Sequence, residues 1–262
     1  MLGHPAGRAP SYPLTGQNGG VPLYRDEAVV LRTHKLGEAD RIITLLTRHH
    51  GRVRAVARGV RRTSSRWGSR LEPFNHVDLQ LAEGRSLDTI TQAETIDPFH
   101  SRLGLDYERY TSGTVMLETA ERLVTEEKEP AVQQFLLLVG GLRAMAGGEH
   151  EAGQVRDSYL LRSLSVAGWA PSFDHCVSCG VEGQHRFFNP SAGGVLCRLC
   201  KLPGSATPAE ETLRLGAALL TGDWPVVHAA EPRHLKEASS LVAAYLAWHV
   251  ERGLRSMAYV ER

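Results

Sequence analysis

Short apolar and alternating stretches fill the chain between residues 27 and 94. The clearest alternation is HVDLQL at 76–81, where every second side chain would face the same side of a strand. The predicted strands are 27–33, 41–47, 53–58, 76–82 and 87–94. All connections are short except 59–75, which is long enough for a helix or a flexible loop. Five short strands with a longer link after the third favour an OB-type barrel, although an SH3-like barrel would give a similar pattern.

Beyond Asp97-Pro98 the apolar positions recur every three or four residues, which is typical of amphipathic helices. We expect their apolar stripes to be core, including Tyr107 and Tyr110 in the first of them. Pro130 predicts the start of a second helix, and Thr207 with Pro208 predicts the cap and first residue of a later one. The predicted helices are 107–124, 130–146, 155–166, one that opens at 207–210, and 235–249.

The two patterns together predict an α+β multidomain protein, with an N-terminal OB-fold β-barrel followed by a helical bundle. Residues 1–20 contain five glycines and three prolines, so we expect a disordered lead there. The barrel domain is predicted at 21–97 and the helical domain at 98–262.

All four cysteines of the 262 residues fall in one window. Two C-x2-C pairs are separated by 17 residues, a spacing that can close a tetrahedral four-sulfur shell around Zn²⁺. Such a shell leaves no ligand position open, so the predicted zinc is structural. It would make an inserted zinc finger at about 172–203, with the ligands Cys176, Cys179, Cys197 and Cys200.

Other uses of these cysteines are less well supported. Two disulfides would need an oxidising compartment, and the first twenty residues lack the pattern of a signal peptide. A thioredoxin-like exchange needs only one C-x-x-C pair, at a strand-to-helix turn. His175 and His185 are minor candidates as replacement ligands. No window has the length and hydropathy of a membrane span.

The net charge of +1 hides a basic segment in the barrel half. Residues 41–70 hold nine arginines and no acidic residue. The arginine fork fits phosphate oxygens and stacks on bases, so this segment favours a phosphate-rich ligand, with a merely solvated basic face as the alternative.

Enzymatic motifs are missing from the chain. There is no P-loop, no H-E-x-x-H, no G-x-S-x-G and no dinucleotide fingerprint. We therefore expect a protein that is not an enzyme.

Several motifs occur in an order typical of one bacterial family. The segments are 24–59, with GEADR at 37–41 and ARG at 57–59, then SRLEPF at 69–74, LLR at 160–162, GWAP at 168–171, 176–180, GGVLC at 193–197 and LRS at 254–256. With these motifs, residues 23 to about 258 resemble the RecO recombination-mediator proteins of bacteria. Some members of that family lack the cysteine quartet, whereas this chain keeps all four.

The resemblance implies a function in DNA repair and recombination. It implies binding to single- and double-stranded DNA, annealing of complementary strands, and work with RecR and RecF to load RecA onto strands coated by single-stranded-DNA-binding protein. A cytoplasmic, nucleoid-associated location would follow. The alternatives are an RNA-binding or ribosome-associated zinc protein, and a non-catalytic scaffold whose arginines contact acidic protein tails.

An annealing protein must neutralise phosphate backbones and leave base edges free, so its contacts should be cationic. The predicted DNA contacts are Lys35, Arg41, Arg52, Arg54, Arg58, Arg61, Arg62, Arg66 and Arg70. Trp67 is predicted to stack on a base, with a core ring as its alternative; Phe74 is better explained as core. Arg186, Arg198 and Lys201 are weaker candidates for a second contact in the finger.

Overall fold

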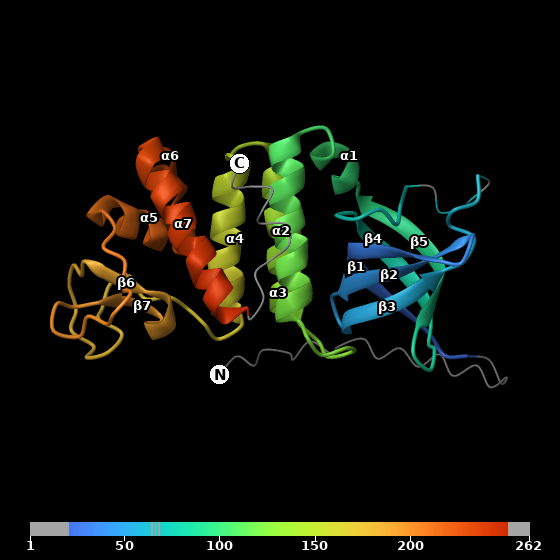
Figure 1. Cartoon of the computed structure of the whole chain (residues 1–262). Coiled ribbons are helices and arrows are strands. Elements are labelled where there is room, and N and C mark those ends of the chain that lie inside the picture. Colours follow the sequence, from blue (N-terminus) through green and yellow to red (C-terminus); the bar gives the residue numbers. More distant parts are fainter. Residues whose placement is uncertain (1–20, 64, 66, 68, 251–262) are drawn as a thin grey trace, which may run out of the picture.

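The computed structural model describes residues 21–250 except 64, 66 and 68. The predicted disordered lead at 1–20, the DNA contact assigned to Arg66 and the motif at 254–256 lie outside the described residues. The barrel lies at one end of the molecule, and the loop at 172–203 that carries the four cysteines, named the cysteine loop, lies at the other. The central helices lie between them (Figure 1).

The barrel is closed by five strands in the order β1-β2-β3-β5-β4. Its strands are β1 (Leu23–Leu36), β2 (Asp40–Thr47), β3 (Gly51–Ala57), β4 (His76–Ala82) and β5 (Asp88–Asp97). The long strand β1 pairs with β4 through its first half and with β2 through its second, and a parallel contact of β3 with β5 completes the ring. This order is the OB-type topology, so the predicted fold class is confirmed.

The segment between β3 and β4 forms turns in its described part rather than a helix. Trp67 in this segment is only 3% exposed and packs in the barrel core with Leu71. Its indole Nε1 donates a hydrogen bond to the carbonyl of Arg58 at 3.0 Å. A ring buried to this extent offers no face to a base, so the stacking role predicted for Trp67 is corrected to that of a core ring. Phe74 is 1% exposed and is also core.

Seven α-helices occur in the described part of residues 21–250, besides the short 3-10 helix η1 (Pro190–Ala192) between β6 and β7. They are α1 (Phe99–Leu103), α2 (Tyr107–Leu123), α3 (Val132–Gly147), α4 (Ala152–Val166), α5 (Glu210–Thr221), α6 (Trp224–His228) and α7 (Pro232–His249). One hydrophobic core joins them to the barrel, since Val29, Leu46 and Phe74 pack in the same cluster as residues of α1 to α7. None of these helices has the length and apolar character needed to cross a membrane.

Four predicted helix starts differ from the structure. Helices α4 and α7 begin three residues before the predicted 155 and 235. Helix α3 begins at Val132, after Ala131, and α5 begins at Glu210, after Ala209. The start of α5 is set by a partner distant in sequence: Glu237 on α7 accepts hydrogen bonds from the backbone N–H of Ala209 and from the Thr212 hydroxyl. That carboxylate takes the place of the local cap that the sequence suggested.

The cysteine loop is inserted between α4 and α5, as predicted. It contains a small hairpin of β6 (Phe187–Asn189) and β7 (Gly194–Leu196). Phe188 packs against Tyr245 of α7, with ring centroids 5.9 Å apart. The hairpin therefore shares the hydrophobic core of the helical bundle.

The connection 124–131 between α2 and α3 runs beside the barrel at the start of β3. Gly51 has a φ of +59°, and a Cβ at this position would lie 1.7 Å from the carbonyl oxygen of Glu129. Only glycine combines this backbone conformation with so close an approach. This contact holds the 124–131 connection against the start of β3. We name this end of the barrel, at Gly51 and Arg52, the junction end.

Candidate nucleic-acid interface and metal centre

The four cysteine Sγ atoms lie within 4.8 Å of one another. Cys179 and Cys197 have a sulfur separation of 3.9 Å. A tetrahedral ion with Zn–S bonds of about 2.3 Å requires sulfurs about 3.8 Å apart, so this arrangement fits a four-thiolate metal centre. The spacing of the two C-x2-C pairs has thus brought all four predicted ligands together.

Tight turns of the backbone point N–H groups at the sulfur and the carbonyl of Cys176. The N–H of Cys197 donates to the sulfur of Cys176 at 3.3 Å, and the N–H of Gly180 donates to the carbonyl of Cys176 at 2.8 Å. The first of these bonds, helped by the N–H groups of Cys179 and Ser178, lowers the pKa of Cys176 to about 6. A thiol with a lowered pKa is readily available as the thiolate that binds metal.

The two histidines considered as replacement ligands bond elsewhere. His175 Nδ1 lies 2.7 Å from the carboxylate of Asp174, and His185 Nε2 lies 2.8 Å from the carbonyl of Val181. Among the described residues, the group that could hold a metal contains the four cysteines alone. The donor set is therefore all sulfur.

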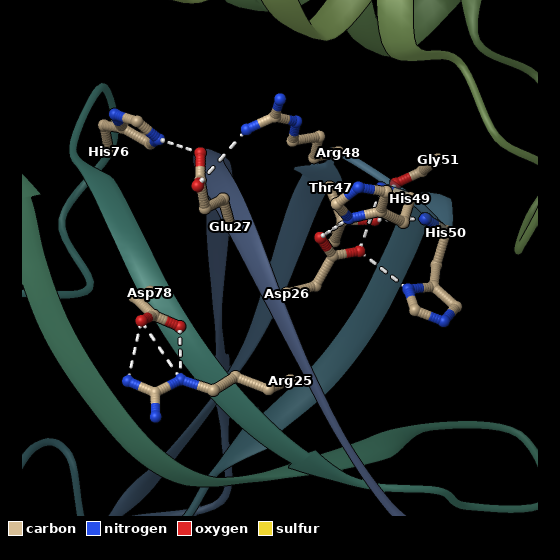
Figure 2. A network of polar contacts seen from close by, with 10 residues as sticks. All are labelled: Arg25, Asp26, Glu27, Thr47, Arg48, His49, His50, Gly51, His76 and Asp78. Carbon is tan, nitrogen blue, oxygen red and sulfur yellow. Dashed lines mark hydrogen bonds and ion pairs between the residues drawn. The ribbon is translucent and has the colours of Figure 1, made fainter. Parts of the chain in front are cut away.

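The arginine-rich segment divides between the two ends of the barrel. At the junction end, Arg52 donates to the carbonyls of Thr125 at 2.5 Å and Glu121 at 3.4 Å. Arg54 makes an ion pair of 2.7 Å with Glu127. Both predicted DNA contacts on β3 are thus engaged by the 124–131 connection, and Arg48 nearby pairs with Glu27 (Figure 2).

At the opposite end, the β1–β2 loop lies beside the first part of the β3–β4 loop, whereas the last part of the β3–β4 loop, 73–75, reaches α1 and α2 (Figure 1). The Arg61 guanidinium donates to the carbonyls of Gly37 at 3.1 Å and Glu38 at 2.8 Å. The N–H of Gly59 donates to the carboxylate of Asp40 at 2.7 Å. These bonds hold the two loops in one arrangement.

Five of the predicted cations are exposed, four in the β3–β4 loop and one near the end of β1. We name them the distal basic surface: Lys35, Arg58, Arg61, Arg62 and Arg70. Arg41 lies beside this surface, where it makes an ion pair of 2.8 Å with Glu72. Two loops that are bonded to each other and present several cations are suited to contact phosphates in a sequence-independent way.

The turn between β2 and β3 is tied to a buried carboxylate at the junction end (Figure 2). Asp26 has a fully buried side chain that accepts hydrogen bonds from the backbone N–H of His49 at 3.0 Å, from His49 Nδ1 at 2.9 Å and from His50 Nδ1 at 2.6 Å. Burial alone would raise the pKa of this carboxyl. The hydrogen bonds from His50 and His49 outweigh that effect and hold the pKa below its ordinary value.

We expect Asp26→Asn to lower the free energy of unfolding at pH 7 by about 1–3 kcal/mol, because the turn loses its charged acceptor. Because the pKa of Asp26 is lower in the folded protein than the unfolded-state pKa of about 3.9, the ionised carboxylate stabilises the folded protein above that pH. This stabilisation is lost as the pH falls through the pKa of the folded state. The difference between the two proteins should therefore shrink below about pH 4. Urea unfolding at several pH values measures it.

Asp78→Asn is the matched control, because Asp78 only pairs with Arg25 on the barrel surface and should cost less than about 1 kcal/mol. Equal losses for the two variants, independent of pH, would contradict the role of Asp26.

A closed OB-type barrel joined to a helical bundle that carries four clustered cysteines defines a class of OB-fold protein with a candidate four-cysteine metal centre. Family models described as Recombination protein O N terminal and Recombination protein O C terminal match residues 21–99 and 104–258. The chain belongs to the RecO family of DNA repair proteins.

Individual relatives agree with this assignment. The chain is 76% identical over 243 residues to a DNA repair protein RecO of Nocardioides sp., and 61% identical over 248 residues to one of Streptomyces avermitilis. It is 57% identical over 242 residues to the DNA repair protein RecO of Thermobifida fusca. Each alignment covers 92% of this chain and the whole length of the relative.

The sequence missed two surface aromatic residues. Tyr107 and Tyr110 were expected in the core stripe of the first helix, but they are 69% and 42% exposed. Helical periodicity identifies one face of a helix, not how far along that face the neighbouring elements extend. Both tyrosines lie in the first turn of α2, where the stripe emerges beside the barrel.

Proposed function

We propose that this chain is a DNA-binding recombination mediator that binds single- and double-stranded DNA and anneals complementary strands. We further propose that it works with RecR, and with RecF, to help load RecA onto strands coated by single-stranded-DNA-binding protein. This function places it at the nucleoid in the cytoplasm. Its membership in the RecO family supports the proposal.

The observation that carries the DNA-binding part is the distal basic surface. In the barrel domain, 21–97, four of these cations lie in the β3–β4 loop and Lys35 lies near the end of β1; that loop is bonded to the β1–β2 loop. Contacts to phosphates alone leave the base edges free to pair with a second strand, as annealing requires. Arg52 and Arg54 stabilise the junction in this scheme, while Arg41 extends the surface.

The proposed metal is one Zn²⁺ ion, held by Cys176, Cys179, Cys197 and Cys200. An all-sulfur, four-coordinate shell suits zinc and leaves no open position, so its contribution is to fold the loop at 172–203. The helical domain, predicted at 98–262, would then carry this loop at the end of the molecule opposite the barrel (Figure 1). The absence of catalysis stays a prediction.

Strand annealing by the purified protein, without nucleotide, tests the proposal. Complementary labelled oligonucleotides should pair faster with protein than without, and affinity for a single strand should fall with salt. About five phosphate contacts give a slope of log affinity against log salt near −3.5, taking about −0.7 per contact.

Competition with RNA of equal length separates the alternatives. A clear preference for RNA would favour the RNA-binding class. Binding to an acidic peptide without binding to DNA would favour the scaffold.

A further inference from the structure

A cleft with a volume of about 960 Å³ separates β1 from α2. One wall is formed by Arg32 and Thr33 of β1, and the other by a face of α2 that begins with Tyr107 and Tyr110. Phe74 lies at the end of the β3–β4 loop and lines the same cleft. Its volume is at the upper end of the range of ligand pockets, about 300–1,000 Å³.

The two tyrosines form an exposed aromatic pair. They are three residues apart on α2, so they lie on the same face. The helix start is fixed by Asp106, whose carboxylate accepts a hydrogen bond from the N–H of Arg109 at 3.0 Å. The buried Phe74 ring meets Tyr110 edge-on, with centroids 5.3 Å apart and planes at 72°. Tyr110 is thereby held in position while 42% of it remains exposed.

The charged residues of the cleft favour an anionic ligand slightly. Arg32, Arg52 and Arg122 line it together with Glu118 and Glu121. Each carboxylate is held by an arginine: Glu121 lies 2.7 Å from Arg32, and Glu118 lies 3.3 Å from Arg122. The Arg32 side chain is 51% exposed and can still reach a ligand.

Two segments of the chain link the cleft to the distal basic surface. Thr33 in the cleft and Lys35 in that surface are two residues apart on β1, so they point to the same side of the strand. Phe74 ends the loop whose earlier part carries Arg58, Arg61 and Arg62. A strand bound along the distal loops would reach the cleft along these two segments.

We propose that this cleft is a stacking site for the unpaired bases of a single-stranded nucleic acid, with Tyr107 and Tyr110 as the rings and Arg32 as a phosphate contact. This inference rests on the proposed function, since the strand arrives from the distal basic surface. Aromatic rings beside an arginine provide sequence-tolerant base stacking. Double-stranded DNA offers no free base faces, so the site would favour single strands.

The test compares fluorescein-labelled oligo(dT) with an abasic oligonucleotide of the same length by anisotropy. Wild type should bind oligo(dT) more tightly than the abasic strand. A stacked base contributes about 1–3 kcal/mol, which converts to about 5- to 150-fold in affinity. The variant Tyr107→Ala/Tyr110→Ala should lose at least about tenfold in affinity for oligo(dT) and less than about twofold for the abasic strand.

Tyr107→Phe/Tyr110→Phe keeps both rings and should bind like wild type. The single variant Tyr107→Ala changes a 69% exposed side chain, so it should fold normally and show part of the loss. Equal losses on both oligonucleotides, or none on either, would overturn the stacking site, as would loss of binding to a protein partner alone. If wild type bound neither oligonucleotide, the proposed function itself would fail.

Discussion

Replacing Cys197 by Ser is expected to release the metal and disorder the loop at 172–203. The remaining three thiolates cannot complete the tetrahedral shell, and structural zinc contributes about 10–16 kcal/mol to small fingers. The net stability of a whole domain is only about 5–15 kcal/mol. A loss of this size should therefore be the largest effect of any single substitution considered for this chain.

The effect should extend beyond the loop. Phe188 and Val195 of the small hairpin belong to the core cluster that includes Tyr245 and other residues of α7. When the loop unfolds, these side chains leave that core, so the helical part should melt at a lower temperature. The barrel has its own core around Val30, Leu45 and Leu79 and should be affected less.

Three measurements check this prediction. Elemental analysis should fall from one zinc ion per chain to nearly none, hydrogen exchange should increase first in 172–203, and the thermal transition should shift downwards. Leu199→Ala is the matched control, because Leu199 lies between Cys197 and Cys200 but is 96% exposed. If Cys197→Ser kept its zinc and its melting curve, the ligand assignment would be wrong.

The second large effect is expected on DNA binding. Arg58→Ala/Arg62→Ala removes two exposed cations of the distal basic surface, and each lost phosphate contact should reduce the salt slope by about 0.7. The slope should change from about −3.5 to about −2.1. Between about 50 and 200 mM salt, wild type should then lose about a hundredfold in affinity and the variant only about twentyfold. Titrations of a labelled single strand over a salt series measure both quantities.

Two further variants locate the interface. Arg25→Ala removes the same kind of charge from the barrel, but Arg25 is bonded to Asp78 on another part of the surface (Figure 2). It should leave the slope unchanged. Arg54→Ala should weaken the junction, where Arg54 pairs with Glu127, and should not change the slope. A fall in slope for Arg54→Ala instead would move the interface to the outer face of β3.

Much of the architecture could be predicted from local patterns. The five strands follow from alternation and β-branched residues. The observed strands differ from the predicted ones only at their ends, most of all in β1 and β5. The fourth strand was predicted with its exact bounds, His76–Ala82, because its alternation is regular. Helix starts were less predictable, since Glu237 on α7 replaces a local cap at the start of α5.

The candidate interface could be predicted only in part. A run of arginines shows that positive charge is present, not which charges are already paired. Arg52 and Arg54 are paired by residues more than sixty positions away, whereas Arg58 and Arg62 remain exposed. The same limit applies to rings: Trp67 in the basic loop is buried, while Tyr107 in an apolar stripe is exposed.

The sequence by itself determined which four cysteines come together, the class of fold and the family. Cysteine spacing, strand alternation and motif order are features of the sequence itself. They can be recognised without knowledge of any tertiary contact. The tertiary structure alone decided which cations face solvent and which rings are available. Those properties depend on ion pairs and burial between residues far apart in sequence, such as Arg54 with Glu127 and Phe74 with Tyr110.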